Sequence, residues 1–343
     1  MALTHLKKFI SRKPSVFFCS VRLTSLCSQN CLQCGIPAQS DGSLISLEAF
    51  DQITQKLYNY GTRVLTMTGG EPALHPQLDE IMGIARSRGF KAIGLLTNLY
   101  YPEAHQDQVI NLAIKHGIGI HTSYDGLAEV ADKLRGAKDV QETVERAMLK
   151  INRFRLEGLY KSHPTATVVV SALNIMQLPQ IISRLEELGW NMNIDLYRWE
   201  SANHRENDIL KIKDPNQIRQ ALQQIRTIKG LKTPLWYYDG LQSRLDGSKR
   251  KQCPYLISPT FGSKFFIREN GDIYTCMNKV LGNLLTDELE ELFAGDKWRE
   301  LLVDFDNCRG CWNNCFTVSS RALSYVHLGT IRQYLWHRRS RTI

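Results

Sequence analysis

The chain has 343 residues, of which 43% are hydrophobic and 22% charged, as in a globular protein. It contains no run of ~18 apolar residues, and its N-terminus lacks an apolar segment with a small-residue cleavage site, so neither a membrane span nor a signal peptide is expected. Eight of the nine cysteines fall in two clusters, which indicates metal binding in a reducing cytoplasm and argues against a secreted disulfide scaffold.

The formal net charge of +9 is located in two tails. Residues 1–14 and 319–343 together carry nine Lys and Arg side chains and no acid, so residues 15–318 are neutral by count. Such tails suit a polyanionic partner or an anionic membrane surface, and the apolar stripe in residues 319–343 equally suits a helix docked on the fold. Nothing resembles a nucleic-acid-binding module, so no specific nucleic acid is expected as a partner.

Short apolar runs alternate with segments of helical period from residue 15 onward. The predicted strands are residues 15–21, 63–68, 91–97, 117–123, 165–171 and 191–197. The helices predicted between them are residues 47–60, 76–88, 105–116, 139–154 and 177–188. Six β-then-α units predict a parallel sheet buried on both faces, either doubly wound or curved into a barrel. On such folds ligands bind at the carboxyl ends of the strands.

The pattern changes after residue 198. Residues 199–250 are polar and mixed, with one helix predicted at 214–229 and an irregular segment at 236–240. Two short apolar runs, 264–268 and 272–276, then flank Asn270-Gly271, which is a strong signal for a β-hairpin. A helix is predicted at 286–302. This part of the chain therefore forms a second, smaller unit.

Three cysteines directly follow the first predicted strand. Cys27, Cys31 and Cys34 are spaced C-x3-C-x2-C, so three thiolates can converge on one soft metal centre. On a four-iron cluster, three cysteines leave one iron open to another ligand. A zinc site is the alternative, and it would need a fourth ligand nearby.

A glycine-rich turn follows the second predicted strand, with the sequence Gly69-Gly70-Glu71-Pro72. The glycines let the backbone approach a ligand closely and Pro72 stiffens the turn, although a plain structural turn is the alternative. Together with the three cysteines, this turn resembles the radical S-adenosylmethionine (radical SAM) superfamily. The later cysteines resemble its SPASM or twitch type of auxiliary iron–sulfur domain, and the resemblance covers about residues 15–315.

The resemblance implies an α/β fold, a partial (β/α)6 TIM-like barrel with a small C-terminal α+β iron–sulfur domain. It predicts the following division of the chain: a basic tail at 1–14, the barrel at 15–213, a bridging segment at 214–250, the auxiliary cluster domain at 251–318 and a basic amphipathic tail at 319–343.

The resemblance also implies site residues. Cys27, Cys31 and Cys34 would hold the SAM-binding [4Fe-4S] cluster, and the amine and carboxylate of SAM would chelate its open iron. Residues 69–72 would bind the amino end of SAM, with Gly70 and Glu71 nearest. Ser123 and Arg135 belong to a segment similar to the family's Ser-x-Asp-Gly and Arg-Gly pattern, and would contact the SAM ribose and carboxylate. A turn at 125–126 and a surface Arg135 are the alternatives. Thr97-Asn98 resembles a Thr-Asn-Gly motif in which Leu99 replaces the glycine.

A second set of five cysteines offers four ligands for one auxiliary [4Fe-4S] cluster. The set comprises Cys253, Cys276, Cys308, Cys311 and Cys315. Cys315 is left over, either as a replacement for one of the close pair or as a thiol that donates a hydrogen atom. A structural zinc at this second site remains open.

The predicted activity is cleavage of SAM to a 5′-deoxyadenosyl radical that abstracts hydrogen from a substrate. The short segment before the first strand and the basic tails favour a small-molecule, sugar or lipid-linked substrate that is oxidised or epimerised. The alternatives are a peptide- or protein-modifying enzyme and, more remotely, a non-catalytic metal-binding scaffold. A flavodoxin or ferredoxin is expected as the electron donor. The expected location is the cytoplasm, with peripheral contact to the inner face of the membrane through the tails as an option.

Overall fold

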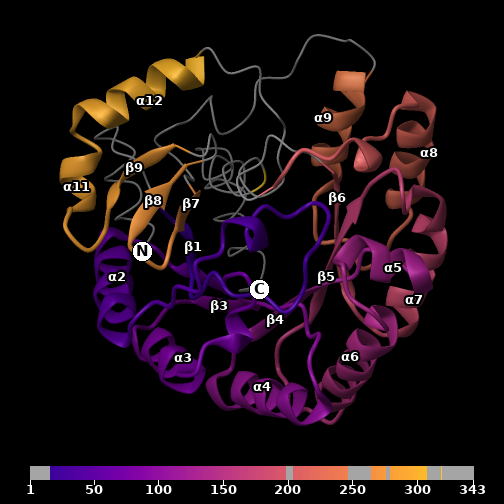
Figure 1. Ribbon diagram of the computed structural model, residues 1–343, viewed down its shortest axis with the longest axis horizontal. Coiled ribbons are helices and arrows are strands. Elements are labelled where there is room, and N and C mark those ends of the chain that lie inside the picture. Colours follow the sequence, from indigo (N-terminus) through magenta and orange to yellow (C-terminus); the bar gives the residue numbers. More distant parts are fainter. Residues whose placement is uncertain (1–15, 198–203, 246–263, 276–278, 307–317, 319–343) are drawn as a thin grey trace, which may run out of the picture.

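The computed structural model describes residues 16–197, 204–245, 264–275, 279–306 and 318. Its centre is one mostly parallel sheet with helices along its outer side (Figure 1). The first six strands are β1 (Phe18–Arg22), β2 (Val64–Thr68), β3 (Ala92–Leu96), β4 (Gly119–Ser123), β5 (Thr165–Val170) and β6 (Asn191–Leu196). They lie side by side in sequence order and do not close into a full barrel. The six predicted strands and the partial barrel are confirmed.

The helices follow the strands as the predicted β-then-α alternation requires. They are α2 (Leu47–Tyr60), α3 (Leu78–Ser87), α4 (Glu103–His116), α5 (Ala128–Arg135), α6 (Val140–Leu156), α7 (Leu178–Glu187), α8 (Pro215–Ile225) and α9 (Leu235–Leu245). Single 3₁₀ turns occupy Pro37–Gln39, Pro72–Leu74, Ile175–Gln177 and Asp208–Leu210. The prediction missed α5. It was wrong about residues 236–240, because α9 buries Tyr237 and Tyr238, and the Tyr238 hydroxyl donates to the carbonyl oxygen of Ile194 at 2.8 Å.

The two faces of the sheet differ in polarity. On β2, Leu65 and Met67 are fully buried under the helices, whereas the alternating Val64, Thr66 and Thr68 are half-buried on the inner face. On β6 the inner face carries Asn191, Asn193 and Asp195. Apolar packing therefore fixes the outer face, and the inner face presents partly accessible polar groups below the carboxyl ends of the strands.

The C-terminal unit continues the same sheet. Strand β7 (Lys264–Ile267) pairs in parallel with β1, and β8 (Asp272–Tyr274) and β9 (Val280–Asn283) follow antiparallel. This confirms the predicted hairpin and adds β9, which was not predicted. The single helix expected at 286–302 is divided into α11 (Leu289–Leu292) and α12 (Asp296–Asp306). A bidentate ion pair between Arg22 at the end of β1 and Glu269 beyond β7 links the two units, with one contact at 2.7 Å.

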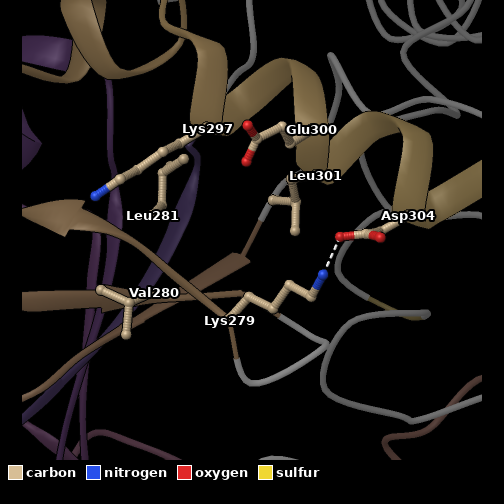
Figure 2. A pocket seen from close by; sticks show the side chains of 7 residues that line it. All are labelled: Lys279, Val280, Leu281, Lys297, Glu300, Leu301 and Asp304. Atoms are coloured by element: carbon tan, nitrogen blue, oxygen red, sulfur yellow. Dashed lines mark hydrogen bonds and ion pairs between the residues drawn. The ribbon is translucent and has the colours of Figure 1, made fainter.

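A cavity of about 190 Å³ lies between β9 and α12 (Figure 2). Lys279 forms an ion pair with Asp304 along its rim, and Lys297 and Glu300 add further charges. It lies at β9, three strands along the sheet from β1, and it is smaller than the ~300 Å³ of typical small-molecule sites. It is therefore separate from the candidate site. Within the described ranges, no helix has the length and apolar character needed to cross a membrane.

Candidate functional site

The three cysteines lie in the loop of residues 23–34, called here the cysteine loop, which leaves the carboxyl end of β1. Its first residues continue the sheet, since the amide of Leu23 donates to the carbonyl oxygen of Thr68 at 2.7 Å. The carbonyl of Leu23 in turn accepts from the amide of Ile45 at 2.8 Å. The loop thus starts where parallel α/β folds place their ligands.

One side of the loop rests on the turn after β2. The amides of Gly70 and Glu71 donate to the carbonyl oxygens of Thr24 at 2.8 Å and Leu26 at 2.6 Å. A Cβ atom on Gly70 would lie 2.1 Å from the Leu26 oxygen, so only glycine fits there. The predicted glycine-rich segment is therefore a backbone clamp on the cysteine loop.

The carboxylate of Glu71 fixes this clamp to the loop after β3. It accepts hydrogen bonds from the Thr97 hydroxyl at 2.7 Å, the Asn98 amide at 2.6 Å, the Ala73 amide at 3.0 Å and the Tyr101 hydroxyl at 3.4 Å. Burial raises the pKa of Glu71 to about 7 despite these bonds. The side chain is only 1% exposed, so the predicted approach of Glu71 to SAM would involve its backbone.

The opposite side of the loop rests on the end of α5. The amides of Asn30 and Leu32 donate to the carbonyl oxygens of Arg135 at 3.2 Å and Leu134 at 2.9 Å. Gly136 ends the helix with φ +61°, and a Cβ atom there would lie 2.5 Å from the carbonyl oxygen of Asn30. A second glycine thus fits directly against the loop, as Gly70 does on the first side.

Arg135 is buried on this second side. Its guanidinium donates to the carboxylate of Asp125 and, at 3.7 Å, to the sulfur of Cys31. Asp125 also accepts from the Gln33 side-chain amide at 2.9 Å and the Val169 amide at 2.8 Å. These contacts exclude the alternative that Arg135 is a surface residue.

A third contact comes from the segment that follows β6. Arg205 donates to the carbonyl oxygens of Leu32 at 2.9 Å and Cys31 at 3.4 Å, and its amide donates to Gln33 at 3.0 Å. Cys34 forms an isolated antiparallel bridge with His204. The cysteine loop is therefore held on three sides by main-chain contacts.

The thiols lie in a desolvated, mutually interacting group. Burial raises the pKa of Cys27 to about 12, and Glu71, Cys31 and Cys34 act in the same direction. Burial likewise raises the pKa of Cys34. These two cysteines are protonated at neutral pH without a metal, so metal binding must displace their protons.

Cys27, Cys31 and Cys34 would hold a four-iron cluster, since three interacting thiols on one loop are a suitable set of soft ligands. No three His, Cys, Asp or Glu side chains of the described residues converge as ligands of one metal ion would. The side-chain oxygen of Gln33, between two of the cysteines, is buried and has no protein partner within the described part.

The remaining predicted residues have different outcomes. Ser123 ends β4 and is half-buried, and its hydroxyl makes no hydrogen bond to another described residue. Leu99 adopts φ +56°, the left-handed conformation for which glycine is favoured, with its side chain fully buried. The five C-terminal cysteines and both basic tails lie outside the described residues.

Several site residues were missed at the level of sequence. Gln33 lies inside the cysteine motif and Asp125 inside the Ser-x-Asp-Gly pattern, yet neither had an assigned role. Arg205 lies in a polar segment without periodicity, and no sequence signal identifies it. Asn98 was noted only as part of a motif, and its side-chain amide approaches the Cys27 sulfur at 4.0 Å.

Comparison with known proteins places this geometry in a family. The model of the radical SAM superfamily matches residues 21–196, and that of the SPASM iron–sulfur cluster-binding domain matches residues 260–315. The subtilosin biosynthesis protein AlbA of Bacillus subtilis is 23% identical over 291 residues, which cover 82% of this chain and 60% of AlbA. Fe-coproporphyrin III synthase of Methanosarcina barkeri is 24% identical over 187 residues, 54% of this chain and 44% of the synthase. The chain thus spans less than two thirds of these relatives.

Solved structures share the fold. SuiB of Streptococcus suis superposes with a TM-score of 0.65 at 14% identity, covering 88% of this chain and 71% of SuiB. The protein anSMEcpe with bound AdoMet superposes with a TM-score of 0.61 at 17% identity, covering 88% of each chain. The chain therefore belongs to the radical SAM superfamily and carries a SPASM domain, and its cofactors are SAM, the SAM-binding [4Fe-4S] cluster and auxiliary iron–sulfur.

Proposed function

We propose that this chain is a radical SAM enzyme that modifies a peptide or protein substrate. Cys27, Cys31 and Cys34 hold the SAM-binding cluster. The supporting observation is the cysteine loop itself, held by main-chain contacts on three sides at the carboxyl end of β1. When bound, the reduced cluster supplies the electron that cleaves SAM, and the resulting 5′-deoxyadenosyl radical abstracts hydrogen from the substrate.

The residues around the loop bind and orient the cofactor in this proposal. Residues 69–72 present backbone groups to the amino end of SAM, because the Glu71 carboxylate is already occupied by protein donors. Ser123 provides a hydroxyl for the ribose, and Arg135 lies close enough to the loop to reach the carboxylate of SAM. An electron donor of the flavodoxin or ferredoxin type supplies the reducing equivalent.

The C-terminal cysteines provide the second redox centre in the proposal. Four of Cys253, Cys276, Cys308, Cys311 and Cys315 bind one auxiliary [4Fe-4S] cluster. When bound, this cluster would either accept an electron from the substrate radical, which would give a net oxidation, or position the substrate. The position of the first strand near the start of the sequence does not decide the substrate class.

Relatives support the peptide substrate over the small-molecule alternative. AlbA, which matches 82% of this chain, is named for bacteriocin biosynthesis, and SuiB has been solved with its precursor peptide SuiA. A probable GTP 3′,8-cyclase of Sulfolobus acidocaldarius is 33% identical, but over only 23% of this chain and 26% of the cyclase. Support for a lipid-linked substrate or for membrane contact does not come from these relatives, so neither is part of the proposal.

Anaerobic purification tests the enzyme assignment. Two four-iron clusters predict about eight irons per chain, together with reductive cleavage of SAM. Cys31→Ala should abolish cleavage, whereas Cys276→Ala should retain part of it. Bound zinc with iron near zero would contradict the assignment, and equal loss in both variants would make the second site structural.

Deuterium transfer tests the substrate class. A lysate from cells grown on deuterated medium is separated into peptide, metabolite and lipid fractions, each incubated with enzyme, SAM and reductant. Deuterium should appear in 5′-deoxyadenosine with the peptide fraction and disappear when that fraction is digested with protease. Transfer from the metabolite fraction alone would restore the small-molecule alternative.

A further inference from the structure

Arg135 connects two groups that the assigned SAM contacts leave unexplained. One guanidinium nitrogen donates to the carboxylate of Asp125, and the other donates to the Cys31 sulfur at 3.7 Å. The Asp125 side chain is 1% exposed and that of Arg135 is 10% exposed. Burying an ion pair this deeply costs free energy, so stability alone does not explain why the guanidinium also contacts the Cys31 sulfur.

Asp125 is held from several directions and so fixes the guanidinium. Its carboxylate accepts from Gln33 and from the Val169 amide, and its carbonyl oxygen accepts from the side chain of Asn174 at 2.5 Å. Asn174 also bonds to the carbonyl oxygen of Val169 at 2.9 Å, which connects Asp125 to β5. The guanidinium is planar and its N–H groups have fixed directions. Because Asp125 holds one of its nitrogens, the direction of the nitrogen that donates to Cys31 is fixed as well.

We propose that Arg135, positioned by Asp125, raises the reduction potential of the SAM-binding cluster through its hydrogen bond to the Cys31 sulfur. This inference rests on the proposed ligation of the cluster by Cys31. Reduction adds negative charge to the cluster and its thiolates. A hydrogen bond and a fixed positive charge at one sulfur stabilise the reduced state more than the oxidised state.

Arg205 provides an internal comparison. It also lies beside the loop, but its guanidinium donates to the carbonyl oxygens of Leu32 and Cys31. Both arginines act electrostatically on Cys34. Loss of Arg205 therefore reports the effect of a nearby positive charge, whereas loss of Arg135 also removes a bond to sulfur.

The test is the midpoint potential of the SAM-binding cluster, measured by EPR. SAM is left out, so that a contact between Arg135 and the SAM carboxylate cannot contribute. The double variant Arg135→Gln/Asp125→Asn removes both charges of the pair and keeps the net charge. We expect the equilibrium constant for reduction of the cluster to fall at least tenfold, which lowers its midpoint potential by about 59 mV for a one-electron couple. Arg135→Lys keeps the charge but cannot bridge both partners, so a smaller fall is expected. The midpoint potential should fall least in Arg205→Gln.

The outcomes separate this inference from the proposed function. Wild-type protein without an iron–sulfur EPR signal would refute the cluster itself. Loaded variants with the wild-type potential, weakened only in SAM binding, would overturn the inference and leave the proposed function intact. If the double variant does not bind the cluster, the midpoint potential of Arg135→Lys decides whether the inference holds. If neither variant loads, the pair serves cluster assembly, and the redox role is refuted.

Discussion

Two of the three contacts that hold the cysteine loop are similar in structure but differ in their electrostatics. The Glu71 side consists of Gly70, Glu71, Thr97 and Asn98, and the Arg135 side consists of Asp125, Arg135 and Gly136. Each side sets a glycine against a loop carbonyl and places a buried carboxylate behind it. The shared glycines show that close backbone approach is the common requirement.

The two carboxylates have different partners. Asp125 pairs with a buried guanidinium, whereas Glu71 accepts hydrogen bonds from two hydroxyl and two amide groups, all of them uncharged. Burial accordingly raises the pKa of Glu71 to about 7, so this side gains negative charge close to neutral pH. The difference implies that a change of pH near neutrality alters the charge of the Glu71 side.

The largest effect is expected where the glycines meet the loop. A methyl group in Gly70→Ala or Gly136→Ala would lie 2.1 or 2.5 Å from a backbone oxygen, so the loop must move. Iron bound by Cys27, Cys31 and Cys34 should then fall to a small fraction of the wild-type amount, measured by iron analysis and EPR of the SAM-binding cluster.

Gly158→Ala separates strain from steric overlap. Gly158 has φ +79°, and apart from its chain neighbours no described residue has an atom within 4 Å of the position that a methyl group would take, so its substitution costs only ~1–2 kcal/mol of backbone strain. Its iron content should be that of the wild type. Equal iron loss in Gly158→Ala and Gly136→Ala would show that positive φ matters there and contact with the loop does not.

The next effect concerns the ion pair. Asp125→Ala leaves the buried Arg135 without its carboxylate, which should destabilise the fold by ~3–5 kcal/mol in anaerobic urea unfolding. Asp239→Ala breaks a more exposed pair with Arg226 and should cost only ~0.2–1 kcal/mol. Similar losses in the two variants would mean that burial of the Asp125 pair carries no special penalty.

The stability contributed by the Glu71 side should depend on pH. The folded chain binds the Glu71 proton more tightly than the unfolded chain, because the pKa rises from 4.5 to about 7. Stability from this group therefore falls by about 3 kcal/mol as the pH rises through that range. Glu71→Gln cannot titrate, so its stability relative to wild type should increase over the same range. A difference independent of pH would contradict the raised pKa.

The barrel was predictable because local and tertiary preferences agree along it. Runs such as residues 165–170 are rich in β-branched residues, and the helices between strands have a clear apolar period. Helix α5 was not predicted because it has only eight residues. Helix α9 was not predicted because its aromatic start resembles an irregular segment in the sequence, and only its packing on β6 shows that it is a helix. Tertiary packing decided both cases.

The sequence predicted the three cysteines, the glycine-rich turn and Arg135, but not the hydrogen bonds that connect them. The spacing of Cys27, Cys31 and Cys34 is local, so the sequence carries it. The hydrogen bonds of Arg135 to Cys31 and of Arg205 to Leu32 join residues 104 and 173 positions apart, and periodicity does not encode such pairings. The burial that sets the pKa of Glu71 likewise arises only when the loops after β2 and β3 meet.

The smallest effect tests a single hydroxyl of the Glu71 side. Thr97→Val keeps the side-chain shape but removes the donor to Glu71 at 2.7 Å and the acceptor for the Leu99 amide at 3.3 Å. We expect a loss of ~1 kcal/mol in urea unfolding and a Glu71 pKa above that of the wild type, because a bond that favours the ionised form is gone. Thr122→Val is the matched control, since that buried hydroxyl has no partner among the described residues, and its loss should be neutral or stabilising. If both valine variants behaved alike, the hydroxyl of Thr97 would contribute nothing to holding Glu71, and the acid would depend on its two amide donors and the Tyr101 hydroxyl.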